Sequence, residues 1–290
     1  MTKFELHLPV ETGNETALSL LKANCQLSVA EIKSAIQKGA LWLESNKKHV
    51  KRFRRVKKTL AVGNTLHFYY DECVLNQVVD SPTLIADHGD FSVWYKPFGM
   101  LSQGSKWSEH TTITRHVSQH FDNQRSVFLV HRLDKSAQGI IVVGHTKSAT
   151  RAIATLFEHH DLTKRYQVIC HHNTLTGSTP KVIEQLIDDK PAKSTALLLQ
   201  YDETSDLAHV EVTIETGRKH QIRKHMASIG MPVVGDRLHG IADNNSLIDL
   251  QLCSVFLRFK SPIDEKILTF ELSESLKPNL QQAINTLNQT

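Results

Sequence analysis

Residues 126–145 read SVFLVHRLDKSAQGIIVVGH, and this stretch decides how the rest of the chain is interpreted. Two apolar runs, 127–130 and 140–143, flank a polar turn, which predicts two strands at one edge of a sheet. The turn carries Arg132 and Asp134 where the first strand ends. Loops at strand ends often hold catalytic and binding residues, so these two side chains are candidates for a site. An Arg–Asp pair that only holds the turn is the alternative interpretation.

Further strands are predicted on both sides of this turn. FSVWYK at 91–96 precedes it, whereas KRYQVICH at 164–171 and the alternating HVEVTIE at 209–215 follow it. A helix is expected at 219–229, ending before Gly230. Many strands with few helices, in no regular strand–helix alternation, indicate the α+β class, with a mainly antiparallel sheet and flanking helices.

The N-terminal part of the chain predicts a small α/β domain over residues 14–70. Its expected elements are two helices, a short strand, a basic stretch and a second strand. Ser28 is followed three residues later by Glu31, which is the pattern of a capping box at the start of the second helix. Residues 71–84 are expected to be a linker, and residues 85–290 the larger domain.

Positive charge is concentrated in the small domain. The chain has a net charge of +4, but residues 1–70 hold 12 Lys and Arg against 5 Asp and Glu. Eight of the 12 residues in KKHVKRFRRVKK at 47–58 are Lys or Arg, a density that a polyanion such as RNA would offset. A solvated basic loop without a partner is the alternative. The residues expected to contact RNA are Lys51, Arg52, Arg54 and Arg55.

A second cationic group follows the alternating strand. TGRKHQIRKHM at 216–226 places basic residues at a helix start, where the helix dipole favours acids, and such a misfit favours a functional role over an ordinary basic helix face. Lys96 precedes a turn and can hold a phosphate, although a plain turn is the simpler interpretation. Taken alone, Tyr166 is a packing residue of a strand and Asp236 a turn residue.

Several function classes lack their sequence signals. No stretch approaches the ~20 apolar residues of a membrane helix, and the N-terminus lacks the pattern of a signal peptide. The four cysteines lie far apart without a Cys-x-x-Cys pair, so we expect a reducing cytoplasm and neither a disulfide framework nor a zinc site. Gly-x-Gly-x-x-Gly and Walker motifs are absent, so no nucleotide cofactor is expected.

In their order, these motifs resemble the RluA family of RNA pseudouridine synthases, the type that acts on large-subunit rRNA and tRNA. The stretches that carry the resemblance are KPFG at 96–99, HRLD at 131–134, KRY at 164–166, TGRKHQIRKHM at 216–226 and PVVGD at 232–236. The order of elements in the small domain resembles the S4 RNA-binding module. The resemblance implies the pseudouridine synthase fold and isomerisation of specific uridines in rRNA or tRNA, without metal or organic cofactor. We expect RNA as the partner, no membrane association and a monomer.

The resemblance also implies roles for individual residues. Asp134 would be the catalytic carboxylate, Arg132 would help to displace and hold the flipped uridine, and Tyr166 would stack on the target base. Arg223 would be the guanidinium paired with Asp134. The residues expected to support RNA binding are Lys96, Arg218 and His220.

The implied reaction breaks the glycosidic bond, rotates the base and joins C5 to C1′. The carboxylate either attacks C1′ or removes the C2′ proton, and both routes require ionised Asp134; burial would raise its pKa and Arg223 would lower it. The chain departs from the family where Ala137 and Gln138 replace hydroxyl residues and where His239 replaces a Tyr. A non-catalytic RNA- or ribosome-binding protein is the alternative function, whereas the basic domain disfavours a hydrolase of small glycosides.

Overall fold

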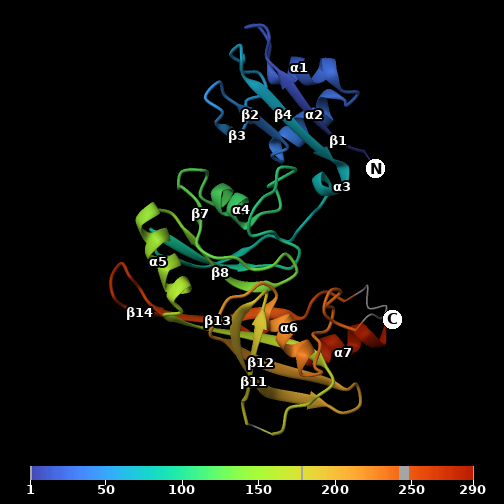
Figure 1. The fold of residues 1–290 in the computed structure, drawn as a ribbon, viewed down its shortest axis with the longest axis vertical. Helices are drawn as coiled ribbons and strands as arrows, with labels where there is room; N and C mark the ends of the chain where they lie inside the picture. Colours follow the sequence, from blue (N-terminus) through green and yellow to red (C-terminus); the bar gives the residue numbers. More distant parts are fainter. Residues whose placement is uncertain (1, 178, 242–247, 290) are drawn as a thin grey trace. The chain divides into compact units, whose positions relative to one another are not determined.

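A computed structural model describes residues 2–177, 179–241 and 248–289 (Figure 1). The chain divides into two compact units. One, here called the N-terminal unit, holds the chain up to residue 79 together with residues 103–119. The other, the C-terminal unit, holds residues 80–102 and the chain from residue 120 onward.

The N-terminal unit is a four-stranded antiparallel sheet in the order β1-β4-β2-β3, with α1 and α2 packed on one face. Its elements are β1 (Lys3–Pro9), α1 (Ala17–Asn24), α2 (Val29–Gln37), β2 (Leu41–Glu44), β3 (Val50–Arg52), β4 (Thr65–Asp71) and α3 (Glu72–Leu75); α4 (Ile113–His120) also begins here. The expected capping box of α2 is confirmed, because Ser28 Oγ accepts from the backbone N–H of Glu31 and the Glu31 carboxylate accepts from that of Ser28.

The boundaries of this unit differ from the expected range of 14–70. β1 pairs with β4 along its whole length and so extends the sheet toward the N-terminus. The expected linker, 71–84, contains α3 and the beginning of β5 (Thr83–Asp87). Residues 103–119, which the sequence placed in the larger domain of 85–290, belong to the N-terminal unit.

The C-terminal unit is built on a ten-stranded sheet whose main path is β10-β11-β12-β9-β13-β8-β6-β5. Its strands are β5, β6 (Phe91–Lys96), β7 (Phe128–Leu129), β8 (Gln138–Gly144), β9 (Leu162–His171), β10 (Lys181–Ile187), β11 (Lys190–Asp202), β12 (Leu207–Ile214), β13 (Leu252–Lys260) and β14 (Ile267–Glu271). Its helices are α5 (Lys147–His159), α6 (Gln221–Ser228), the 3-10 turn η1 (Glu274–Leu276) and α7 (Leu280–Asn288). The strand pairs are antiparallel except β8 with β13, so the predicted α+β class with a mainly antiparallel sheet is confirmed.

The parallel contact between β8 and β13 fixes the position of the HRLD turn. Gly139 at the start of β8 pairs with Ser254 of β13, and a Cβ atom on Gly139 would lie 2.3 Å from the Ser254 carbonyl oxygen. Gly139 has φ +114°, so only glycine suits both the backbone and the close approach. Ser254 also pairs with Tyr166 of β9, which brings the chain just before β8 close to Tyr166.

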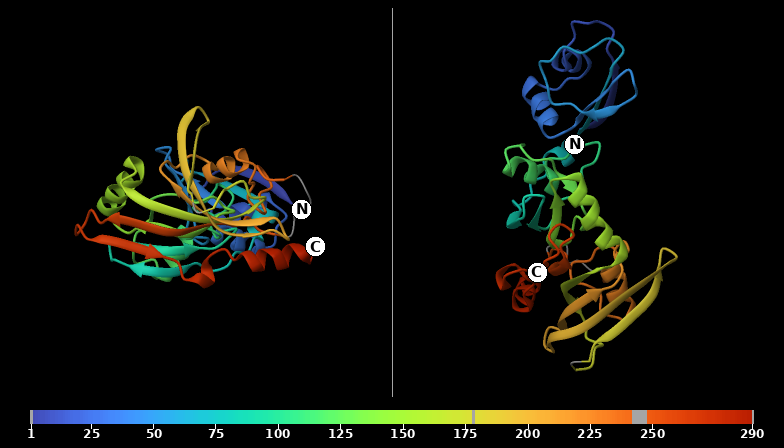
Figure 2. Two further views of the ribbon diagram at one scale, coloured as in Figure 1. Left: turned by 90° about the horizontal axis from the view of Figure 1, so that it is seen from below. Right: turned by 90° about the vertical axis from the view of Figure 1, so that its left-hand side faces the viewer.

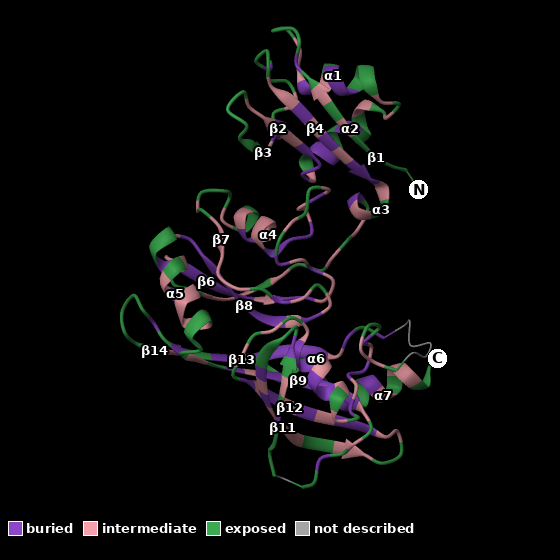
Figure 3. Cartoon of the chain, in the orientation of Figure 1, coloured by how far each residue is buried: buried purple, intermediate pink, exposed green. Residues whose placement is uncertain are grey.

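The two faces of this sheet carry different helices. Side chains alternate between the faces of a strand, so Tyr166 and Ile169 of β9 point to opposite sides. Ile169 packs against Leu280 and Ala283 of α7, whereas α6 lies on the side of Tyr166 (Figure 2). Most of β8 and β9 is buried (Figure 3), so Tyr166 stands on a well-packed strand.

One local prediction was wrong in detail. The expected helix at 219–229 begins at Gln221 and ends at Ser228. In the described ranges, the structure contains no helix with the length and apolar character needed to cross a bilayer.

Candidate active site

A pocket of about 380 Å³ opens in the C-terminal unit where the HRLD turn, β9 and the start of α6 come together. Of the described residues that line it, Asp134 alone carries a carboxylate. Its basic lining residues are Arg132, Arg218, Lys219 and Arg223. The apolar part of the wall includes Tyr166 and Leu252. Even without Arg223, which is paired with a carboxylate outside the lining, positive side chains outnumber the one carboxylate, so the pocket suits a negatively charged ligand.

Asp134 stands at the mouth of the pocket. Its side chain keeps 39% of its surface exposed, and its Oδ2 lies 3.7 Å from His220 Nε2. The backbone carbonyl of Asp134 accepts a hydrogen bond of 3.1 Å from the N–H of Ala137, which closes the turn behind the carboxylate. Asp134 is therefore reachable by a ligand while its backbone is fixed.

A serine that sequence reasoning missed holds the residue before Asp134. Ser102 Oγ accepts from the backbone N–H of Leu133 at 3.0 Å and donates to the Leu133 carbonyl at 2.6 Å. Ser102 is buried, so water does not compete strongly for these bonds. Gly99 adds a third link, because its N–H donates to the carbonyl of Lys135. No motif marked Ser102; only its place shortly after KPFG could have suggested it.

The two residues that depart from the family behind Asp134 are both well placed. Ala137 is buried and lines the pocket with its methyl group. Gln138 Oε1 accepts a hydrogen bond of 2.7 Å from the Tyr95 hydroxyl. The hydrogen bond between Tyr95 and Gln138 thus holds the loop in place of the absent hydroxyl residues.

Tyr166 presents its ring to the pocket from β9 and is 9% exposed. Burial raises the pKa of Tyr166 to about 12, and the negative charge of Asp134 acts in the same direction while a hydrogen bond with Ser254 opposes it. Tyr166 is therefore a neutral aromatic surface beside the carboxylate.

The expected ion pair between Arg223 and Asp134 is wrong. The buried Arg223 guanidinium forms a two-pronged pair with Asp236, with Nε 2.7 Å from Oδ2 and Nη2 bound to Oδ1. Asp236 also accepts from the backbone N–H groups of Leu238 and His239. Burial would raise the pKa of Asp236, but these hydrogen bonds outweigh it and hold the pKa below its ordinary value. Asp236 is thus a buried partner of the site and not an ordinary turn residue.

The expectation that Lys96 binds RNA is also wrong. Its side chain is fully buried, and its ammonium donates to the carbonyl oxygens of Pro97 at 3.1 Å and Met100 at 2.8 Å. Burial lowers the pKa of Lys96 to about 7, although the Asp134 carboxylate acts in the opposite direction. Lys96 fixes the 97–100 turn from within and has no surface to offer a phosphate.

The other predicted residues of this unit gather at the pocket. Arg132 is exposed at its rim and makes no hydrogen bond or ion pair within the described part of the chain. Arg218 lines the pocket and donates from Nε to the Pro191 carbonyl at 3.1 Å. His220 is half-buried between Asp134 and His239.

Gln221 is a further residue that sequence reasoning missed. Its side chain accepts from the Thr216 hydroxyl at 2.7 Å and from the Arg218 N–H at 3.0 Å, and it donates to the Lys193 carbonyl and to Ser194 Oγ. Gln221 therefore fastens the turn between β12 and α6, which presents the cationic residues to the pocket.

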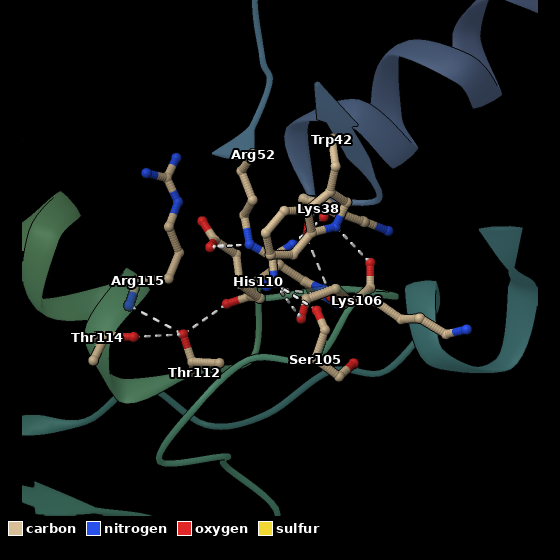
Figure 4. Close-up of polar contacts among 12 residues, drawn as sticks. Lys38, Trp42, Arg52, Ser105, Lys106, His110, Thr112, Thr114 and Arg115 are labelled. Atoms are coloured by element: carbon tan, nitrogen blue, oxygen red, sulfur yellow. Dashed lines mark hydrogen bonds and ion pairs between the residues drawn. The ribbon is translucent and has the colours of Figure 1, made fainter. Parts of the chain in front are cut away.

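In the N-terminal unit, Arg52 is largely buried on internal partners, which contradicts the expectation that it contacts RNA. Arg54 binds the same carboxylate but keeps 34% of its side chain exposed, so its contact with RNA stays a prediction. Arg52 Nε lies 2.6 Å from Glu109 Oε2, and Arg54 binds the other oxygen of Glu109. The Arg52 Nη2 donates to the Ser105 carbonyl at 2.5 Å (Figure 4). The Arg52 guanidinium also lies over the Trp42 ring, 4.4 Å from its centroid. Burial lowers the pKa of Arg52 to about 10.

Lys51 and Arg55 differ from these two arginines because they are exposed and form no ion pair in the described ranges. The same holds for the neighbouring lysines of the basic stretch, Lys47, Lys48, Lys57 and Lys58. Six cations of the stretch thus remain available to a partner.

Comparison with known proteins shows which family this chain resembles. Residues 90–228 match the RNA pseudouridylate synthase family. An uncharacterized RNA pseudouridine synthase of Helicobacter pylori is 27% identical over 58% of the chain, and tRNA pseudouridine synthase C of Yersinia pestis is 29% identical over 60%. Ribosomal large subunit pseudouridine synthase D of Buchnera aphidicola is 26% identical over 61%. The matches cover 62%, 79% and 65% of these relatives, so the chain spans about three fifths of the length of the Helicobacter protein.

A solved structure has the same fold. Human RNA pseudouridylate synthase domain containing 1 aligns with 74% of this chain and 97% of its own length, with a TM-score of 0.58 and 21% sequence identity. The motifs, the fold and the sequence matches agree: residues 90–228 form a domain of the RNA pseudouridylate synthase family, as the resemblance to the RluA type predicted.

Proposed function

We propose that the chain isomerises uridine to pseudouridine in RNA, with Asp134 as the catalytic group. The observation that carries the proposal is the charge pattern of the pocket, where one carboxylate faces three basic side chains without an ion pair, Arg132, Arg218 and Lys219, beside an aromatic ring. A nucleotide within RNA brings phosphates for the cations, a flat base for Tyr166 and a sugar for the carboxylate. A volume of about 380 Å³ lies in the usual range for small-molecule sites.

The chemistry needs a single ionised carboxylate. Asp134 either attacks C1′ as the N1–C1′ bond breaks, or removes the C2′ proton to give a glycal, and the base then rotates. C5 bonds to C1′ as the Asp134–C1′ bond breaks or as Asp134 returns the proton to C2′. The C5 proton then leaves to solvent, and N1 takes up a proton. Hydrolytic glycosidases use two carboxylates that flank the bond, whereas the described lining of this pocket holds only Asp134. Since 39% of the Asp134 side chain is exposed in the free protein, the bound nucleoside itself completes its desolvation.

The uridine must leave its stack before it can reach Asp134. Extrusion costs a few kcal/mol, and stacking on an aromatic ring such as Tyr166 returns about 1–3 kcal/mol. Arg132, exposed and unpaired at the rim, is placed to hold the displaced nucleotide or to fill the gap it leaves.

The substrate class we propose is tRNA or rRNA. Relatives are named as acting on each, tRNA pseudouridine synthase C and ribosomal large subunit pseudouridine synthase D. The N-terminal unit, with its S4-like order of elements and six exposed, unpaired cations, would bind the phosphate backbone around the target.

The test is the release of tritium from RNA labelled at C5 of uridine, because forming the C5–C1′ bond expels that hydrogen. Mixed tRNA and rRNA transcripts serve as substrate for the full chain. We expect release by the wild type and none above background by Asp134→Asn or Asp134→Ala. Asp161→Asn, an exposed carboxylate outside the pocket, is the matched control and should release tritium at the wild-type rate.

Retention of activity by either Asp134 variant would refute the role of this carboxylate. A wild-type protein that binds the transcripts but releases no tritium would instead support the alternative function, an RNA-binding protein that has kept the fold.

A further inference from the structure

Three titratable side chains lie in a row at the pocket. Asp134 Oδ2 is 3.7 Å from His220 Nε2, and on the other side of the same ring His220 Nδ1 is 2.9 Å from His239 Nε2. They come from three separate segments: the HRLD turn, the residue before α6, and the turn after Asp236. His239 is also the position where the sequence departs from the tyrosine of the family.

The backbone of His220 is unusual for its place. His220 occupies the N-cap position of α6 with φ +56°, in the left-handed region that residues other than glycine rarely adopt. Its side chain makes no capping hydrogen bond to the helix. The strained backbone instead directs the ring between Asp134 and His239, and strain of this kind is concentrated at functional sites.

His239 is held in place by the buried ion pair described above. Asp236, bound to Arg223, accepts the backbone N–H of His239 at 3.0 Å. The two imidazole rings are 5.1 Å apart between centroids and inclined at 66°, so they meet edge to face. The contact between the rings is therefore a directed hydrogen bond and not a stack.

Two ring nitrogens 2.9 Å apart share one proton in a hydrogen bond, and either His220 or His239 can be the donor. If His220 donated from Nδ1, the lone pair of its Nε2 would face the Asp134 carboxylate, an unfavourable arrangement. If His239 donates from Nε2–H, His220 accepts at Nδ1 and carries its own proton on Nε2, facing the carboxylate. The charge of Asp134 therefore selects the second tautomer.

The surroundings disfavour a second proton on His220. Burial lowers the pKa of His220; the Asp134 carboxylate acts against this, and the positive charges of Arg223 and Lys219 and the ring of His239 act with it. Asp188, on the turn between β10 and β11, is a further negative group that interacts with this ring. A neutral His220 leaves Asp134 ionised without the full positive partner that would weaken it as a nucleophile or base.

We propose that His239 is a positioning residue, which donates from Nε2–H to His220 Nδ1 and so keeps the Nε2–H of His220 directed at the catalytic carboxylate. The inference rests on the proposed function, because it assigns His239 to the same reaction. The tyrosine that the family carries here also offers a hydroxyl donor, so a histidine can replace it without loss of that hydrogen bond.

The experiment compares His239→Phe with His239→Tyr in the full chain, two variants that differ only by the hydroxyl donor. In the wild type, ¹⁵N NMR should show His220 protonated at Nε2 and unprotonated at Nδ1. His239→Phe frees Nδ1 to take a proton, so the pKa of His220 should rise. The kcat for tritium release should fall about tenfold at unchanged KM, the rate equivalent of one lost hydrogen bond.

His239→Tyr should restore kcat and the low pKa of His220, which a purely structural role of the ring would not predict. His159→Phe, at an exposed position on α5, is the matched control and should change neither. The proposal is overturned if wild-type His220 carries its proton on Nδ1, or if His239→Phe and His239→Tyr behave alike. The tautomer is measured without substrate, so these outcomes are distinct from an inactive wild type, which would overturn the proposed function instead.

Discussion

At the scale of single residues, the site is organised by how each buried charge is compensated. Arg223 is 4% exposed and needs a carboxylate; the sequence analysis paired it with Asp134 and interpreted Asp236 as a turn residue. Asp236 is the carboxylate that pairs with Arg223, because its side chain is fully buried and already accepts hydrogen bonds from two backbone N–H groups. Asp134 is thereby left free of a strong ion pair, which suits a group that must react.

Asp236→Asn tests this division of roles. Removing one partner of a buried pair leaves the Arg223 charge uncompensated, so the free energy of unfolding should fall by about 3 kcal/mol at pH 7. The folded-state pKa of Asp236 lies below its unfolded value. Its stabilising contribution is therefore complete above the unfolded value of about pH 4 and is lost as the pH falls through the folded pKa.

Urea unfolding of wild type and Asp236→Asn between pH 3 and pH 8 provides the measurement. The difference in the free energy of unfolding between wild type and Asp236→Asn should be constant above about pH 4 and should become smaller below it. Asp264→Asn, whose exposed carboxylate pairs with Lys266 on a hairpin turn, is the control and should unfold at the wild-type urea midpoint at every pH above about 4. An equal gap at all pH values would show that Asp236 does not stabilise the fold as an ion.

At the scale of secondary-structure elements, the sequence predicted a helix or strand correctly where residues close together in the sequence determine that element. The capping box of α2 and the alternation of β12 are readable because the residues that decide them are three or two positions apart. β10 has no such signal, because it is an edge strand with Val182 and Leu186 exposed. Residues 103–119 were misassigned because their contacts in the N-terminal unit lie 33 or more positions earlier in the chain, as between His110 and Gln77 or between Ser108 and Lys38.

Glu109 is the residue that fastens this segment to the N-terminal unit. Its carboxylate binds both Arg52 and Arg54, and its backbone N–H donates to the Lys38 carbonyl at 2.9 Å. Glu109→Gln removes the negative charge between two partly buried guanidinium groups, so we expect a loss of about 2 kcal/mol in the free energy of unfolding of this unit.

The fluorescence of Trp42 and Trp107, both in this unit, reports its unfolding in urea. Glu265→Gln, which breaks the exposed 3.4 Å pair with Lys260, is the matched control and should cost at most about 0.5 kcal/mol. Equal midpoints for Glu109→Gln and the control would mean that the arginines do not depend on Glu109.

The candidate site itself could be predicted in part. Asp134, Tyr166 and Arg132 lie in short motifs, and the structure brings all three to one pocket. The pairings could not be predicted, because Arg223 with Asp236, or His220 with His239, depend on distances between loops that no local pattern encodes. Lys96 looked like a surface cation because sequence alone does not show that its ammonium finds two carbonyl oxygens inside the fold.

At the scale of the whole molecule, charge is divided unevenly between the two units. The net +4 conceals a cluster of positive charge in the first seventy residues, and within the 47–58 stretch the cations without an internal partner are the ones most accessible to a polyanion. In the 47–58 stretch, the structure separates Arg52 and Arg54, which are bound to Glu109, from exposed residues such as Lys51 and Arg55.

This separation predicts how RNA affinity depends on salt. Each phosphate contact releases counterions, so replacing Lys51 and Arg55 together by Ala should reduce the slope of log K against log salt by about 0.7 per lost contact on single-stranded RNA. The double replacement of Lys260 and Lys266, exposed on the β13–β14 hairpin, removes the same charge from the C-terminal unit and should leave the slope unchanged. Fluorescence anisotropy with a labelled transcript over 50–300 mM salt, about the range in which counterion release dominates, gives both slopes. If the two double variants lose affinity equally, net charge alone attracts the RNA; if only Lys51 and Arg55 matter, the basic stretch makes the contact.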